Sequence, residues 1–278
     1  DHARMHLEGM AHLADQFIFL VQRLGRGSRL LTADQRRDIL ALVKLLGYRP
    51  RGASAATAIE TFTIAQPATS VVYIPAGSIV RTEERLSPRR FQVLATAAID
   101  VGQTSTTALV EPSSTSTAAI LSTDVPLQSY RMTDFPYLDR TIAVTTSAGV
   151  WTEVDNFLAS TSTDRHYTTG IDARDRVTVN FGGARGVGVI PNGLITFTYK
   201  IGGGAAGNVG AGALTLPEFS VVDQNGVVQQ MTVTNGPTTP GYDRESGAEI
   251  QTNAPGSLTI PRSAVSRPDY EVIAERMP

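Results

Sequence analysis

Apolar residues recur at helical spacing over the first part of the chain. Between residues 4 and 24 they stand three or four positions apart, which predicts an amphipathic helix that ends at Gly25. Packing against a second helix of the same chain and packing against a neighbouring chain both fit this pattern. The residues of the predicted apolar face, which we take as interface candidates, are Leu7, Met10, Phe17, Ile18 and Val21.

A second helix is predicted from Thr32 to Leu46. Thr32 followed by Gln35 forms a capping-box pattern, and Gly47 with Pro50 marks the end. Because a short linker joins the two helices, we expect an αα-hairpin.

The pattern changes after residue 56, where β-branched residues dominate and turn-forming residues recur. This residue pattern predicts that the rest of the chain forms mostly β-strands. The polar segment 111–120 is of low complexity and predicts an exposed connection between two β modules. The predicted strands are 59–64, 71–74, 78–82, 91–96, 142–145, 177–181, 194–201, 219–222 and 228–233.

Near the end of the chain, Ser266 predicts the start of a short helix with Pro268 in its first turn. The elements together predict an α+β fold: an N-terminal helical hairpin, a β-rich body of two modules and a short C-terminal helix. The predicted divisions are 1–56 for the hairpin, 57–112 for the first β module, 113–235 for the main β-rich module and 236–278 for the C-terminal segment.

The composition predicts a soluble chain with a substantial core. Apolar residues make up 41% of the 278 residues, and apolar runs such as 17–21 are far shorter than the roughly 18 residues that cross a bilayer. The absence of cysteine excludes a disulfide framework and a thiolate nucleophile. The sequence begins at Asp1 rather than at methionine, which indicates a trimmed N-terminus, so targeting is not read from it.

Charge is distributed unevenly although the net charge is only −2. Residues 1–51 carry nine basic and five acidic side chains, and residues 52–278 carry fifteen and twenty-one. This split favours docking of unlike protein faces over binding of a nucleic acid, which requires a strongly basic patch. Of the 24 basic residues 22 are arginine, which suits protein interfaces; a codon bias explains it equally well.

A glycine-rich segment raises the question of phosphate binding. It contains the spacing G-x-G-x-x-G at Gly202, Gly204 and Gly207. A dinucleotide loop requires these glycines to lead from a strand directly into a helix, but further glycines and a proline interrupt the helical pattern that follows. We therefore interpret the three glycines and Asn208 as a structural connection and as interface candidates, and we expect no cofactor.

The sequence contains no familiar catalytic or metal-binding pattern. His2 and His6 lie one helical turn apart, but His12 points elsewhere, so a zinc site lacks its third ligand. Asp172 and Asp175 stand where a hairpin turn favours aspartate. A nucleophile elbow, a Walker loop and a zinc-protease motif are all missing from the sequence, and we expect the chain not to be an enzyme.

A series of motifs runs along nearly the whole chain. In order they are LGYRPRGASAA from Leu46, VYIPAGSIVRT and RRFQVLATAAI from Val72, VWTEVDNFLAS from Val150, NFGGARGVGVIPNG from Asn180, ITFTYKIGGGAAGNVGAGAL from Ile195 and NAPGSLTIPRSAVSRPDYEVIA from Asn253. Together they resemble the baseplate J-like family, the wedge proteins of contractile phage tails and related injection machines. The passage 241–251 departs from the family's pattern.

This resemblance implies a structural subunit of a baseplate wedge, which links hub, sheath-proximal and peripheral components and rearranges on contraction. The implied partners are other copies of the chain and other baseplate proteins in a six-fold ring, with neither nucleic acid binding nor membrane insertion. The implied location is a virion tail baseplate assembled in the host cytoplasm, or a bacterial contractile injection particle. In the closing motif, Arg262 and Asp269 become a candidate pair within or between subunits, and Tyr270 a candidate buried ring.

Two other classes of function stay open at this point. A β-rich extracellular adhesin or carbohydrate-binding module has a similar composition, although Trp151 is the only tryptophan available to stack on a sugar. A hydrolase requires clustered carboxylates, for which Glu83 and Asp172 are the candidates.

Overall fold

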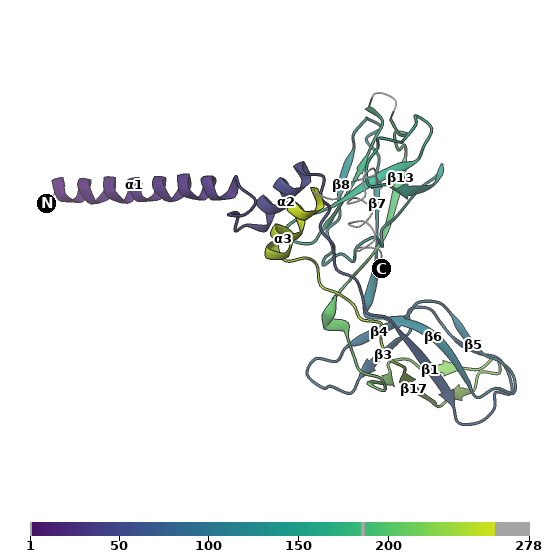
Figure 1. Cartoon of the computed structure of the whole chain (residues 1–278). Helices are drawn as coiled ribbons and strands as arrows, with labels where there is room; N and C mark the ends of the chain where they lie inside the picture. The colour runs from purple at the N-terminus through teal and green to yellow at the C-terminus, as the bar shows by residue number, and fades with distance from the viewer. Residues whose placement is uncertain (1, 185–186, 259–278) are drawn as a thin grey trace, which may run out of the picture. The chain divides into compact units, whose positions relative to one another are not determined.

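The computed structural model describes residues 2–184 and 187–258, and the chain divides into two compact units (Figure 1). The first unit comprises the chain up to Arg51 together with the chain from Glu245 onward, and the second runs from Gly52 to Arg244. The described residues form three α-helices and seventeen strands. This content agrees with the predicted α+β class.

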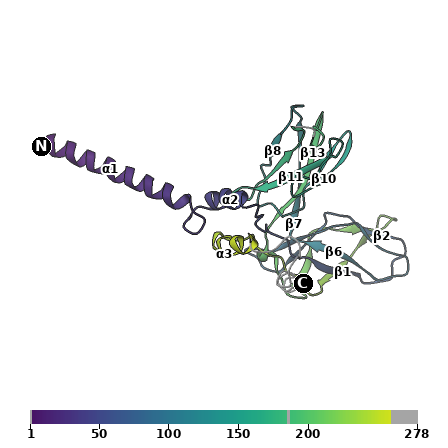
Figure 2. The same ribbon diagram turned by 45° about the horizontal axis from the view of Figure 1, so that its top comes forward.

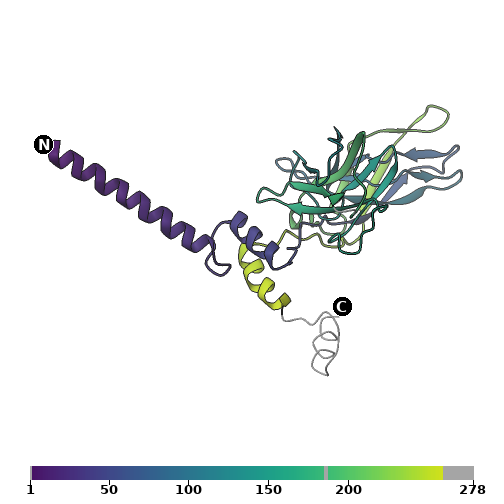
Figure 3. The same ribbon diagram turned by 90° about the horizontal axis from the view of Figure 1, so that it is seen from above.

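Helices make up the described part of the first unit. They are α1 (His2–Gly27), α2 (Arg36–Leu45) and α3 (Gly247–Leu258). α2 and α3 lie side by side (Figures 2 and 3). The small core that they bury consists of Ala33, Ile39, Val43, Ile250 and Ala254.

α2 begins at Arg36 rather than at the predicted Thr32. The Thr32 hydroxyl donates to the carbonyl oxygens of Arg26 and Arg29 at 3.0 and 3.4 Å, so it is used by the preceding turn. Gln35 takes the cap position without a side-chain capping hydrogen bond, and its Oε1 instead accepts from the Arg23 guanidinium at 3.0 Å. The predicted capping box at Thr32 is therefore wrong.

The end of α2 lies where the sequence predicts it. Gly47 has a φ of 73°, its N–H donates to the carbonyl of Lys44 at 3.1 Å, and the N–H of Tyr48 donates to that of Val43 at 3.0 Å. These two hydrogen bonds define a Schellman motif. Glycine suits it because the left-handed conformation then carries no Cβ penalty.

α3 begins with a capping box that the sequence reading missed. The N–H of Glu249 donates to Ser246 Oγ at 3.2 Å, and the N–H of Ser246 donates to Glu249 Oε2 at 2.7 Å. This is the reciprocal pattern of Ser-x-x-Glu. The hydrogen bonds from Ser246 lower the pKa of Glu249. The predicted helix that starts at Ser266 lies outside the described residues.

α1 and α2 do not form the predicted hairpin. The large apolar side chains of α1 are exposed rather than buried against α2. The reason is that α2 packs on α3 instead, and Ile39 and Val43 of α2 are buried in that contact. The sequence pattern did not predict α3 at residues 247–258, so it left the first helix as the partner for the apolar face of α2.

The second unit contains a six-stranded antiparallel sheet with the order β14-β3-β4-β6-β1-β17. The sheet curls until its edge strands β14 and β17 meet, and the N–H of Gly212 donates to the carbonyl of Asn235 at 2.8 Å. The pairs β2-β5 and β15-β16 complete the module. The strands are β1 (Ala58–Ile64), β2 (Val72–Ile74), β3 (Ile79–Thr82), β4 (Arg90–Val93), β5 (Ala97–Ile99), β6 (Ser105–Glu111), β14 (Leu214–Pro217), β15 (Val221–Val222), β16 (Val228–Gln229) and β17 (Met231–Asn235).

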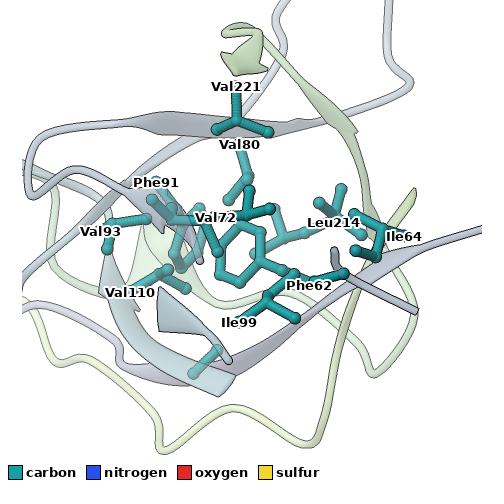
Figure 4. Close-up of a cluster of buried hydrophobic side chains, with 14 residues drawn as sticks. Phe62, Ile64, Val72, Val80, Phe91, Val93, Ile99, Val110, Leu214 and Val221 are labelled. Atoms are coloured by element: carbon teal, nitrogen blue, oxygen red, sulfur yellow. The ribbon is translucent and has the colours of Figure 1, made fainter. Parts of the chain in front are cut away.

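The core of this module is built from inward residues that alternate along the strands. In β1, Phe62 and Ile64 are buried while Ile59 is exposed, as a sheet with one covered face requires. Figure 4 shows Phe62 and Phe91 surrounded by aliphatic side chains from several strands.

A seven-stranded sheet forms the rest of the second unit, with the order β7-β13-β9-β10-β11-β12-β8. Its pairs are antiparallel except β10 with β11. Aromatic rings fill its core, where Trp151 packs edge-on against Phe181 with ring centroids 5.0 Å apart. The strands are β7 (Ser113–Leu121), β8 (Ser129–Arg131), β9 (Ala143–Thr146), β10 (Gly149–Glu153), β11 (His166–Ile171), β12 (Val177–Phe181) and β13 (Leu194–Gly202).

Two segments differ from the sequence interpretation. Residues 113–121 are not a connection but strand β7, which pairs with β13 over its whole length; threonine and serine in an exposed strand need no apolar alternation. Residues 214–217 and 231–235, which the sequence grouped with the main module, pair in the six-stranded sheet as β14 and β17. The four-part division of the chain stays a prediction.

One inward position of β1 is a carboxylate. Glu60 is fully buried between its cross-strand neighbours Ala108 and Asn235. Within the described part of the chain, neither of its carboxylate oxygens has a hydrogen-bond partner. Burial raises the pKa of Glu60 to about 8, because the apolar core disfavours the charged form.

We predict that Glu60→Gln removes a loss of stability at high pH. The pKa of Glu60 is higher in the folded state than in the unfolded state, so the folded state binds this proton more tightly. The resulting stability is fully present at pH values below the pKa of the unfolded state, and it is lost as pH rises toward about 8. Between pH 5 and pH 8, urea unfolding should show the natural chain losing about 3 kcal/mol relative to the variant. Parallel pH profiles for the two proteins would contradict this assignment.

Candidate interaction surfaces

The first candidate surface is the apolar face of α1. Its residues lie on the helix as predicted, but they are not buried within the chain. Two-thirds or more of the side chain is exposed for several of them. The exposed fractions are 69% for Leu7, 70% for Met10, 69% for Phe17, 54% for Ile18 and 53% for Val21.

The sequence allowed the apolar face of α1 to pack either on α2 of the same chain or on a neighbouring chain. The described residues of the same chain, those of α2 included, leave the face of α1 uncovered. Contiguous apolar surface of this kind in a folded protein marks a site of interaction with another protein or a membrane. Among the described residues, no helix is long and apolar enough to cross a membrane. A role of these five residues between chains stays a prediction.

The second candidate surface is the glycine-rich connection that follows β13. Its glycines sit where the backbone of the chain passes very close to itself. A Cβ at Gly202 would lie 2.6 Å from the carbonyl oxygen of Pro112, and one at Gly204 would lie 2.6 Å from Asp243 Oδ1. A Cβ at Gly207 would collide with the ring of Pro112. Glycine is therefore required here because another part of the chain lies too close to the backbone to leave room for a Cβ.

Asn208 fixes the same connection through hydrogen bonds. Its Nδ2 donates to the carbonyl of Gly241 at 3.2 Å, and its Oδ1 accepts from the N–H of Gly241 at 2.7 Å. The Arg89 guanidinium donates to the carbonyl oxygen of Asn208. The four predicted residues thus come together in the structure, at a crossing of the chain with itself. Their role at an interface between subunits stays a prediction.

The structure around the glycines differs from a phosphate-binding loop. Gly202 ends β13 and is followed by a three-residue 3₁₀ turn, Ala205–Gly207. Within the described chain this connection leads on to β14 rather than into an α-helix. A phosphate would lack the aligned N–H groups of a helix N-terminus that such loops provide.

A network of charged and polar side chains lies where the chain passes from the six-stranded sheet to the seven-stranded sheet. Lys200 Nζ lies 2.6 Å from Glu111 Oε1, and Glu111 is buried. Gln92 donates to Ser113 Oγ at 2.7 Å, and Ser113 donates to the Glu111 carboxylate. This network joins β4, the end of β6, the start of β7 and β13, where the chain passes from one sheet to the other.

A buried carboxylate also organises the first unit. Glu245 accepts hydrogen bonds from Tyr48 Oη at 2.8 Å, from the N–H of Arg51 at 2.8 Å and from Asn253 Nδ2 at 2.7 Å. Burial raises the pKa of Tyr48 to about 12, with the hydrogen bond to Glu245 as the next contribution. One side chain therefore connects the segment after α2 with α3. Sequence reasoning missed Glu245, because only the fold brings Tyr48 next to it.

The carboxylates considered for catalysis have other roles. Asp172 accepts hydrogen bonds from the N–H groups of Arg174 and Arg176 and pairs with the Arg176 guanidinium at 2.7 Å. Burial acts to raise the pKa of Asp172, but these hydrogen bonds lower it overall. Asp175 has a φ of 60° in the same turn. The predicted turn chemistry is confirmed.

The remaining candidates are placed as follows. Glu83 accepts a hydrogen bond from Thr215 at 3.1 Å. Trp151 is buried in the seven-stranded core, which removes it as a surface for stacking a sugar. No group of three or more metal-ligating side chains occurs among the described residues. Arg262, Asp269 and Tyr270 lie outside the described residues.

Comparison with known proteins finds similarity only at the level of distant structure. No protein-family model matches the sequence, and no curated protein matches it either. Among solved structures, the chain is similar to a chain of the TssK-TssF-TssG baseplate subcomplex of the type VI secretion system, with 7% sequence identity and a TM-score of 0.42. The match covers 92% of this chain and 79% of that chain.

We predict that Gly204→Ala destabilises the second unit by about 2–3 kcal/mol, because the new methyl group overlaps the backbone of Tyr242 and the Asp243 side chain. Gly210→Ala is the matched control in the same segment, since no atom lies within 4 Å of a Cβ there. The control should change stability by no more than about 1 kcal/mol. Equal effects of the two substitutions in urea unfolding would refute close approach as the reason for Gly204.

We also predict that Glu245→Ala loosens α3 from α2. The substitution leaves Tyr48 Oη, Asn253 Nδ2 and the N–H of Arg51 without their acceptor, which costs about 2–4 kcal/mol for buried groups. Hydrogen exchange should quicken at the amides of α3. Glu84→Ala, at an exposed position, serves as the control; unchanged exchange in α3 of the Glu245 variant would argue against the network.

Proposed function

We propose that this chain is a structural subunit of a contractile-tail baseplate wedge. In this role it links hub, sheath-proximal and peripheral components and rearranges when the tail contracts. Its partners are other copies of itself and other baseplate proteins, arranged in a six-fold ring. Its location is a virion tail baseplate assembled in the host cytoplasm, or a bacterial contractile injection particle.

The observation that carries the proposal is the order of the sequence motifs. They extend from the passage at Leu46 to the closing motif that starts at Asn253. The glycine-rich motif beginning at Ile195 is the most distinctive of them, and three of its glycines, Gly202, Gly204 and Gly207, occupy positions where a Cβ would collide with the chain. A motif under such steric constraint is informative, because substitution there has a physical cost.

The exposure of α1 supports the same proposal independently of the motifs. An amphipathic helix of 26 residues with its apolar face in solvent is poorly stabilised alone, since most helix stability comes from packing of that face. A neighbouring helix of another subunit would cover it. Leu7, Met10, Phe17, Ile18 and Val21 are then the residues that pack across chains.

Rearrangement on contraction requires interfaces that separate and form again. Moderate, polar interfaces that contain arginine suit this better than one continuous hydrophobic seam. The abundance of arginine in the sequence and the exposed guanidiniums of residues such as Arg90 fit such contacts around the glycine-rich connection.

The proposal predicts that Phe17→Asp prevents incorporation of the chain into particles. The substituted carboxylate would be buried without a partner at the interface, so affinity for neighbouring subunits should fall by at least about thirtyfold. Tail particles purified from producing cells should then lack the variant, as judged by immunoblot. The isolated chain should keep its fold, because Phe17 is exposed.

Gln16→Asp is the matched control on the same helix. Gln16 is exposed and lies about 100° or more around the helix from each of the five apolar residues, so particles should incorporate this variant normally. Normal incorporation of Phe17→Asp would remove α1 from the interface, and absence of the natural chain from every particle fraction would remove the proposed function itself.

A further inference from the structure

Strand β7 forms one edge of the seven-stranded sheet. It pairs with β13 in unbroken register over nine residues, from Ser113 opposite Gly202 to Leu121 opposite Leu194. Within the described residues, no strand pairs with its other side. An edge of this kind presents unpaired N–H and C=O groups that are a template for a further strand.

The register shows which residues of β7 carry the unpaired groups. The N–H of Leu138 donates to the carbonyl of Lys200, and the N–H of Gly202 donates to the carbonyl of Pro136. Lys200 and Gly202 therefore direct their backbone groups away from β7, and the alternate residues of β13 bond to it. The alternate residues of β7 point to the free side. These are Ser113, Thr115, Thr117, Ala119 and Leu121.

Other edges of the two sheets are protected, and β7 is not. β8, the opposite edge of the same sheet, has three residues and includes Arg131. β14 ends in Pro217 and shifts register within its pairing, and it meets β17. β7 contains no charge and no proline, and its register has no shift. Proteins use those devices to prevent edge-to-edge pairing, so their absence leaves the edge beyond Ser113, whose hydroxyl is bonded to Gln92 of β4, open to a further strand.

We propose that β7 pairs with β7 of a second copy of this chain, antiparallel about a two-fold axis at Thr117. Full overlap of two antiparallel nine-residue strands places the central residue opposite itself. Thr117 points its N–H and C=O to the free side, so the two copies would exchange backbone hydrogen bonds directly at the axis. The pairing would join two seven-stranded sheets into one continuous sheet.

The side chains of β7 fit this occupant. Thr117 meets Thr117 of the second copy, a favourable cross-strand pair, and Thr115 meets Ala119. Because β7 has no ionisable side chain, no like charges face each other across the axis. Thr115, Thr117, Ala119 and Leu121 are exposed in the single chain, so their side chains do not have to move before pairing. A self-complementary patch of this kind is what a two-fold dimer requires.

The pairing does not depend on the proposed baseplate role, since it involves the sheet alone. Its test uses the 278-residue chain and two opposite charges at the axis. Thr117→Lys and Thr117→Glu each place like charges opposite each other, so each variant alone should dimerise at least about tenfold more weakly than the natural chain in sedimentation equilibrium. An equimolar mixture of the two should dimerise at least as well as the natural chain, because lysine then faces glutamate.

A cross-linking experiment locates the contact, and it is simple because the chain has no cysteine. Thr117→Cys should form an intermolecular disulfide under mild oxidation, since residues at a two-fold axis in paired strands lie within disulfide distance. Thr152→Cys is the control, an exposed threonine on the interior strand β10 of the same sheet, and should remain unlinked. Unchanged unfolding midpoints in urea confirm that the variants fold.

Two results would overturn the proposal. One is equal disulfide formation by the Thr117 and Thr152 variants, which indicates random collision. The other is failure of the mixed Lys and Glu variants to associate more strongly than either alone. Association through α1 does not imitate the expected result, because charge at residue 117 would not affect it.

Discussion

The structure depends on the close crossing of backbone at Pro112 and the glycines after β13. The chain passes from the six-stranded to the seven-stranded sheet at Pro112 and returns through residues 202–213. A Cβ at Gly202 or Gly207 would overlap Pro112, and one at Gly204 would overlap Tyr242. Only glycine allows the outgoing and returning segments to lie in contact. Asn208 and the Lys200–Glu111 pair then hold them there.

This constraint explains how one compact unit contains two separate cores. Each sheet encloses its own apolar cluster, one mainly aliphatic and one mainly aromatic, and the strands that enter and leave are tied at the crossing. In the first unit, Glu245 connects the segment after α2 with α3. Among the described residues, the apolar face of α1 and the outer edge of β7 have no packing or strand partner. Both present groups that another polypeptide can cover.

Sequence reasoning succeeded where a local pattern decides the structure. Helical periodicity placed α1, Gly47 with Pro50 placed the end of α2, and aspartates in a turn accounted for Asp172 and Asp175. It failed where contacts between segments far apart in the sequence determine the local structure. The polar residues 113–121 form a strand because they pair with β13. The Thr32 hydroxyl donates to the carbonyl of Arg26 instead of capping α2. The Ser-x-x-Glu signal at Ser246 was readable and was missed, whereas Glu60 and the network at Glu245 have no signal in the sequence alone.

The central claim is that this chain acts by fitting against other polypeptides in a ring. Its most direct test is electron microscopy of intact contractile particles that carry an affinity-labelled version of the chain. The account predicts label confined to the baseplate end of the particle and distributed with six-fold symmetry. Label spread along the tail, or particles that assemble and contract without the chain, would contradict it.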